Sequence, residues 1–384
     1  MNQEAPTRWA PILAVVLAGI AGAAQIGKVP AAMTTIGAEF GLGLAGAAWL
    51  VGLFALMAAG GGLALGLAAA RIGARRALLL GIAIGTLAAL GAALAPAMLP
   101  LMAARIVEGA GFLLLTVSAP GIIAATASGR DRAFAMALWG TYMPAGVALG
   151  LLSAPLVEAW GWRIAWLALA AFFGATGLLC WAAAPADPPR AVQREPIAAQ
   201  LRALVAARRP LRLALAFGTY NVIYVGIAAF LPARLETLGA GTGEAGIAAA
   251  IAAIGNAGGN LAGGALMRRG VAPALLIQAG ALAMALMGAA IFVLPLPALV
   301  IGAALLACGI GGVLPAACFA LLPRAVPRPE LAAPAVGLVI QGNNLAQLLA
   351  PPVIGALAGL GWSYAALPLL LAGGFAVLAG RALR

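Results

Sequence analysis

The sequence predicts an all-α integral membrane protein, with twelve transmembrane helices arranged as two pseudo-symmetric six-helix bundles. Three observations support this fold class: the composition, the length of the apolar stretches, and the placement of basic residues between them. Hydrophobic residues make up 64% of the 384 residues, charged residues only 8%, and histidine is absent. Soluble domains are usually about half apolar and about a quarter charged, so a soluble fold is excluded.

A helix that spans a bilayer needs about 20 mostly apolar residues. The chain divides between polar breaks into stretches of that size, each of which predicts one spanning helix. In order, they lie near residues 10 to 35, 46 to 68, 77 to 95, 99 to 126, 134 to 157, 163 to 184, 211 to 233, 244 to 267, 272 to 294, 297 to 320, 331 to 359 and 362 to 380. Pro30, with Gly27 before it, predicts that the first helix is long and broken.

Basic residues mark one side of the membrane. Of the 22 basic residues, 18 lie in alternate breaks, the first being Arg8 before the first stretch, whereas the other breaks hold only Arg163 and Arg234. Cytoplasmic loops carry the excess of Lys and Arg, so we expect both termini in the cytoplasm. Because 21 of the basic residues are arginines, the composition is typical of a GC-rich bacterial genome and favours the inner membrane. The net charge of +12 then reflects topology and anionic lipid rather than nucleic acid.

An internal repeat predicts the domain organisation. A polar segment at 185–210 separates a six-helix bundle at 1–184 from a second at 211–384, and we expect the segment to be a cytoplasmic linker. Pro96 is matched by Pro295 after 199 residues, and Gly161-Trp162 by Gly361-Trp362 after 200. The pattern after the second helix recurs after the eighth at a similar offset. Duplicated halves with a midplane site between them are typical of secondary transporters.

These features resemble the major facilitator superfamily over the whole chain. The signature G-x-x-x-D-R-x-G-R-R after helix 2 is matched by Gly66, Arg71, Gly73, Arg75 and Arg76, but Ala70 and Ala74 replace the acidic residue and one arginine. Arg105 and Gly109 match R-x-x-x-G in helix 4. Gly140, Pro144, Gly146 and Gly150 are similar to the exporter motif of helix 5, with Met143 in place of a glycine. The stretch from Lys28 is loosely similar to the cyanate permease branch. The resemblance implies alternating access, usually by a monomer.

Lys28, the only lysine, lies inside an apolar stretch and is the first candidate for binding a substrate, with Gln25 nearby as a second. Charged residues in a span are costly and usually functional; the alternative is that Lys28 snorkels to the outer headgroups. Arg105 and Glu108 are three residues apart on one helical face. They form either a structural pair or a site in which Glu108 takes a proton and frees Arg105 for an anion.

The remaining candidates are uncharged. They are Asn221, Asn256, Asn260, Gln341 and Asn344 in the second half, together with Tyr142, Tyr220 and Tyr224. Amides of this kind either join helices or orient a polar ligand. The only lysine precedes Val29 rather than Ser or Thr, which excludes a Walker-type ATP site. We expect no cofactor, no metal and no enzymatic activity.

The sequence therefore predicts a secondary transporter that moves a small organic or inorganic anion by alternating access, with possible proton coupling through Glu108. The alternative is a proton-driven exporter of drugs or amphipathic metabolites, which would use Glu108 with Trp139, Tyr142 and Tyr224. A transporter-like sensor or a membrane-embedded enzyme is a third class. The largest loop, 185–210, is too short for a signalling domain.

Overall fold

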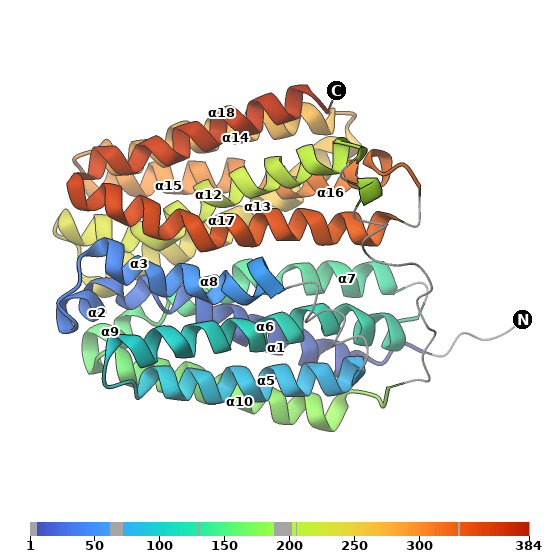
Figure 1. Ribbon diagram of the computed structural model, residues 1–384, viewed down its shortest axis with the longest axis horizontal. Coiled ribbons are helices and arrows are strands. Elements are labelled where there is room, and N and C mark those ends of the chain that lie inside the picture. The colour runs from blue at the N-terminus through green and yellow to red at the C-terminus, as the bar shows by residue number, and fades with distance from the viewer. Residues whose placement is uncertain are drawn as a thin grey trace, which may run out of the picture. The chain divides into compact units, whose positions relative to one another are not determined.

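The computed structural model describes residues 6–61, 72–128, 131–187, 202–204, 206–328 and 331–383, and these are helical without strands. Within them, eleven helical segments are long and apolar enough to cross a membrane. The remaining predicted span, the eleventh, is occupied by the 29-residue helix α17 (Ala332–Leu360). The all-α membrane fold is thus confirmed (Figure 1). Residues 188–201 and 205 of the predicted linker, and Gly66, Ala70 and Arg71 of the signature, lie outside the described residues.

By packing, the chain divides into two units. The first comprises Met1–Ile36, Leu53–Arg190 and Thr242–Ala250, and the second comprises Gly37–Gly52, Ala191–Gly241 and Ile251–Arg384. This grouping follows contacts and does not test the predicted duplication boundaries at 184 and 211, which stay a prediction.

The helices of the first unit include four long ones, α1, α5, α6 and α10, that lie side by side (Figure 1). In chain order the elements are α1 (Trp9–Gly27), η1 (Pro30–Ala32), α2 (Met33–Glu39, shared with the second unit), η2 (Leu53–Ala55), α5 (Ala74–Ala93), α6 (Met98–Thr126), α7 (Arg132–Gly140), α8 (Tyr142–Leu151), α9 (Ala154–Trp160) and α10 (Trp162–Ala183). The start of α13 (Thr242–Arg268) belongs here as well.

The second unit has the same kind of architecture, in which α12 and α18 each contact α14 and α17. Its elements are α3 (Leu44–Gly52), α12 (Arg209–Thr237), most of α13 (Thr242–Arg268), α14 (Pro273–Val293), α15 (Pro297–Gly311), α16 (Val313–Ala325), α17, η4 (Trp362–Ala365) and α18 (Ala366–Arg381). Proline stands in the first turn of α12, α14 and α15. There its missing N–H costs nothing, because first-turn N–H groups have no helical partner.

The first predicted span is indeed broken. Helix α1 ends at Gly27, a single 3-10 turn begins at Pro30, and α2 follows. Proline lacks the N–H that would bond the carbonyl of Ile26, and the N–H of Ala32 bonds Val29 at 3.0 Å rather than Lys28. The break therefore leaves backbone carbonyls near Lys28 open to other donors.

The predicted repeat recurs in the backbone. Gly161 and Gly361 each separate two helices and have φ of 82° and 151°, and Gly73 and Gly270 after the second and eighth spans have φ of 108° and 90°. Left-handed φ values favour glycine because a side chain would clash. The same turn chemistry is therefore found at the positions that the predicted repeat pairs.

The two arginines in the other set of breaks share one role. Arg163 donates to the carbonyl of Ala95 at 3.2 Å, just after α5, and its guanidinium lies 4.3 Å from the Trp162 ring. Arg234 donates to Leu294 at 2.8 Å, just after α14, and lies 5.6 Å from Trp362. A cation at a helix C-terminus stabilises the unpaired carbonyls there, which accounts for both exceptions.

Candidate functional site

A buried ionic cluster lies in the first unit at the break after α1. Lys28 and Arg105 are each 0% exposed, and Glu108 and Gln25 are 1% exposed. Lys28 stands directly after the last residue of α1, whereas Arg105 and Glu108 come from the first half of α6. The Lys28 side chain is therefore enclosed by the protein, whereas snorkelling requires the ammonium group to reach water.

Glu108 is shared by both cations. Its Oε1 accepts a hydrogen bond from Lys28 Nζ at 2.8 Å, and its Oε2 accepts one from Arg105 Nη1. The spacing of three residues predicts the contact with Arg105, but the contact with Lys28 joins residues 80 apart in the chain. Two cations and one carboxylate leave the cluster with a formal charge of +1, held away from water.

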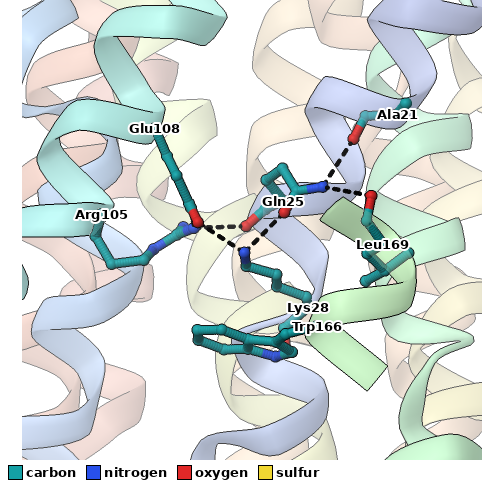
Figure 2. Close-up of polar contacts among 7 residues, drawn as sticks. All are labelled: Ala21, Gln25, Lys28, Arg105, Glu108, Trp166 and Leu169. Carbon is teal, nitrogen blue, oxygen red and sulfur yellow. Dashed lines mark hydrogen bonds and ion pairs between the residues drawn. The ribbon is translucent and has the colours of Figure 1, made fainter. Parts of the chain in front are cut away.

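Gln25 and Trp166 fix the position of Lys28 (Figure 2). Gln25 Oε1 accepts from Lys28 Nζ at 2.7 Å, while Gln25 Nε2 donates to the carbonyls of Ala21 and Leu169 at 3.2 and 3.3 Å. The Lys28 ammonium lies 4.4 Å from the centre of the Trp166 ring, and the Trp166 indole N–H donates to the Lys28 carbonyl at 3.3 Å. That carbonyl is one of those released by the helix break. Both ends of the Gln25 amide are used within the protein, so its contacts are those of a positioning residue.

Arg105 also bonds to the broken helix. Its Nη1 donates to the carbonyl of Gln25 at 2.9 Å, and its guanidinium lies 4.7 Å from the Phe54 ring. Cations are attracted to the faces of aromatic rings, so Phe54 and Trp166 flank the two positive charges. Such partners offset part of the cost of removing charge from water.

A row of aromatic rings leads from Arg105 through the first unit. Phe54 contacts Phe112 at a centroid distance of 5.3 Å, Phe112 lies 6.2 Å from Tyr142, and Tyr142 stacks on Trp139 at 4.1 Å. Phe112 and Tyr142 are half-buried. Tyr142, chosen from the sequence, thus joins the cluster only through intervening rings.

The candidates of the second unit are held by uncharged contacts. The Tyr220 hydroxyl donates to Asn256 Oδ1 at 2.9 Å, and Asn256 Nδ2 donates to the carbonyl of Cys308 at 3.0 Å. Tyr224 stacks near Tyr220, with ring centroids 5.9 Å apart. Asn221 Nδ2 donates to the carbonyl of Asn343 on α17 at 3.0 Å. These bonds join α12 to α13 and α17, and α13 to α15.

The other three amide candidates are less buried than Asn256. Asn260 is exposed on α13, one turn beyond Asn256, and Gln341 and Asn344 are half-buried on α17.

Sequence reasoning missed Trp166 and Phe54. With eight tryptophans and eleven phenylalanines in the chain, residue type alone gave no signal to single them out.

Comparison with known proteins decides the family. The sequence profile of the Major Facilitator Superfamily matches residues 12–332. The chain belongs to the major facilitator superfamily. Superfamily members are membrane transporters, so this protein is a multi-span member of a transporter family, as its sequence predicts.

Solved structures share the superfamily fold. A bacterial homologue of the human lysosomal transporter Spinster, inward-facing and unoccupied, superimposes with a TM-score of 0.81 at 17% identity, covering 99% of this chain and 98% of the other. A mutant of the nucleoside transporter NupG gives a TM-score of 0.78 at 14% identity, covering 97% and 98%. At these identities the likeness concerns the fold alone.

Two curated relatives come from Mycobacterium tuberculosis. The uncharacterized MFS-type transporter Rv1250 (strain ATCC 25618 / H37Rv) is 32% identical over 136 residues, which are 35% of this chain and 24% of Rv1250. The multidrug resistance protein Stp (strain CDC 1551 / Oshkosh) is 30% identical over 137 residues, which are 35% of this chain and 26% of Stp. The chain spans about a quarter of the length of the curated relatives it matches.

Proposed function

We propose that this protein is a secondary transporter that carries a small monovalent oxyanion together with a proton, working as a monomer in the bacterial inner membrane with both termini in the cytoplasm. The observation that supports this most directly is the bridging carboxylate of Glu108. One of its oxygens bonds Lys28 and the other bonds Arg105. A small carboxylate or nitrate-like anion presents the same pair of oxygens to the same two donors.

The proton follows from charge balance. When Glu108 takes a proton, it no longer neutralises Lys28 and Arg105, and the cluster rises from a formal charge of +1 to +2. An arriving monovalent anion restores +1. Proton and anion together thus leave the buried charge unchanged, whereas either one alone changes it, and changes in buried charge are costly. The charge balance therefore favours two states, one with both the proton and the anion bound and one with neither.

The size of the substrate follows from burial. The four polar residues of the cluster are at most 1% exposed, and the Trp166 and Phe54 rings lie against its two cations. A ligand that replaces the carboxylate of Glu108 therefore has to be of similar size. A ligand drives alternating access only through different affinities for the two states, and neutralising a buried cation pair supplies such a difference.

The experiment measures anion uptake into liposomes that contain purified protein, with the interior alkaline and with small carboxylates and nitrate as the panel. We expect uptake to accelerate under the inward proton gradient. In Lys28→Met, uptake should fall about tenfold or more, because a hydrogen bond to a charged group contributes about 1.5–3 kcal/mol and a factor of ten corresponds to about 1.4 kcal/mol.

The matched control is Thr176→Val. It removes a buried hydroxyl from α10, the helix that carries Trp166, but that hydroxyl bonds only within its own helix, to the carbonyl of Phe173 at 2.7 Å. Uptake should stay near the wild-type rate in this variant. Wild-type anion uptake by a folded Lys28→Met protein would refute the proposal.

The aromatic row favours a second candidate, proton-driven export of lipophilic cations or other amphipathic compounds. Phe112 and Tyr142 are half-buried and line up with the buried Trp139, an aromatic surface of the kind that binds such compounds. The relative Stp is named a multidrug resistance protein. In this case a panel of lipophilic cations, rather than anions, should produce transport, and Trp139→Ala should weaken it while Glu108→Gln abolishes its dependence on the proton gradient.

A further inference from the structure

An apolar groove lies on the surface of the first unit, between the beginning of α1 and the end of α10. Its volume is about 690 Å³, and its walls run along α1 from Arg8 to Leu17 and along α10 from Leu179 to Ala183. It is far along α1 from the ionic cluster, which stands at the opposite end of that helix. The transport proposal therefore does not use it.

Small side chains produce the groove. Ala10 and Ala14 face it from α1, and Ala182 and Ala183 face it from α10. Leu13 and Leu179 form part of its rim and are 53% and 50% exposed. An exposed apolar surface on a spanning helix faces hydrocarbon, so an acyl chain is the chemistry that fits the walls.

The dimensions match one leaflet. Nine residues of α1 separate Arg8 from Leu17, which is about 14 Å at 1.5 Å per residue. The hydrocarbon core of a bilayer is about 30 Å thick, so one leaflet contributes about half of that. The groove thus accommodates the length of one acyl chain in the leaflet where Arg8 lies.

A positive charge on an anchored backbone stands at one end of the groove. The backbone N–H of Arg8 donates to the carbonyl of Thr126 at 2.9 Å, and the neighbouring Thr7 hydroxyl bonds Ser128 at 2.8 Å. Arg8 is exposed, and within the described part of the chain its guanidinium has no hydrogen-bond or ion-pair partner. Trp9, 37% exposed beside it, is a residue type enriched at the level of lipid headgroups.

We propose that this groove is a binding site for an anionic phospholipid, whose acyl chain lies between α1 and α10 and whose phosphate-bearing headgroup pairs with Arg8. The positive-inside pattern puts Arg8 in the cytoplasmic leaflet, where anionic lipids are abundant. Zwitterionic lipids fit the same walls, but their headgroups carry no net charge for Arg8 to neutralise. The site is therefore selective for headgroup charge.

The experiment uses Trp9 as the reporter. The full chain is placed in phosphatidylcholine vesicles that contain a minor fraction of brominated phosphatidylglycerol or, in parallel, of brominated phosphatidylcholine. Bromine quenches nearby tryptophans, and subtracting the signal of Trp9→Phe isolates Trp9. A basic residue near the membrane surface contributes about 1 kcal/mol toward anionic lipid, so we expect roughly a fivefold preference for phosphatidylglycerol over phosphatidylcholine.

Arg8→Gln should abolish this preference, and Arg381→Gln, which removes an exposed arginine at the end of α18, should retain it. Ala182→Phe fills the groove and should reduce quenching of Trp9 by both lipids, which tests the acyl-chain site without removing the charge. Equal quenching by the two lipids in the wild-type protein, or an unchanged preference in Arg8→Gln, would overturn the proposal. Neither outcome depends on whether the protein carries anions.

Discussion

The interiors of the two units differ in the kind of polarity they contain. The first unit buries Lys28, Arg105 and Glu108 as a charged cluster, whereas the second buries Tyr220 and Asn256 as a neutral hydrogen-bonded pair. A buried carboxylate can change its charge when a proton binds, but an amide cannot. Among the described residues of these two interiors, the group suited to coupling transport to a proton is therefore in the first unit.

The framework of the two units is nevertheless alike. Each has a tryptophan after a left-handed glycine, at Gly161-Trp162 and Gly361-Trp362, and each has an arginine on the carbonyl of a helix end. The comparison teaches that the two units share the groups that hold helix ends but differ in their buried polar residues. We therefore expect substrate binding and coupling to depend on the residues in which the two units differ.

The largest expected effect is that of Glu108→Gln. This variant leaves Lys28 and Arg105 adjacent without the carboxylate that bridges them, and breaking a buried ion pair costs about 3–5 kcal/mol. The thermal unfolding temperature in detergent should fall steeply. Nitrate or formate should restore it far more than in the wild-type protein, because the anion replaces the missing carboxylate.

The control for this variant is Glu236→Gln. Glu236 is half-buried near the end of α12, and only its backbone carbonyl accepts a described hydrogen bond, from Gly239 at 3.0 Å. The same chemical change there should alter stability little and create no response to anions. If Glu108→Gln were as stable as the wild type, or were stabilised equally by anions, the two cations would not be an anion site.

A smaller effect is expected from Asn256→Leu in the second unit. The change leaves the Tyr220 hydroxyl without the partner that Asn256 provides, at a cost of about 1–3 kcal/mol for an unsatisfied buried group. The Cys308 carbonyl also loses Asn256 but keeps the N–H of Gly312 at 3.0 Å, so its loss is smaller. Added anions should not restore the loss, in contrast to Glu108→Gln. Thermal unfolding with and without nitrate measures both effects.

Asn260→Leu makes the same substitution one turn further along α13, where the side chain is exposed, and should lower stability little.

Combining Asn256→Leu with Tyr220→Phe removes both partners of one hydrogen bond. The double variant should therefore lose less stability than the sum of the losses of the two single variants. An anion-sensitive Asn256→Leu protein would show that the second unit also contributes charge recognition.

Periodicity predicted most of the fold but only part of the site. Apolar stretches and alternate arginines depend on local composition, and the contact of Arg105 with Glu108 depends on helical spacing, so both are readable from the sequence. The contact of Lys28 with Glu108 is not, because it joins α1 to α6 and depends on how those helices pack. Trp166 is selected by the geometry of the break, which frees the Lys28 carbonyl that its indole bonds. Gln25 was predicted to bind substrate, and that role stays a prediction, although both ends of its amide bond protein groups.

The smallest expected effects test whether the shared framework is equivalent in the two units. Arg163→Gln and Arg234→Gln should each lower stability by about 0.3–1 kcal/mol, the usual contribution of a cation at a helix C-terminus. The sites lie in different units and share no partner, so the losses in thermal unfolding should add in the double variant. Arg269→Gln, an exposed change after α13, serves as the control. Similar, additive losses would mean that the two units share the energy as well as the geometry of this contact. A loss confined to one arginine would mean that only one unit depends on it.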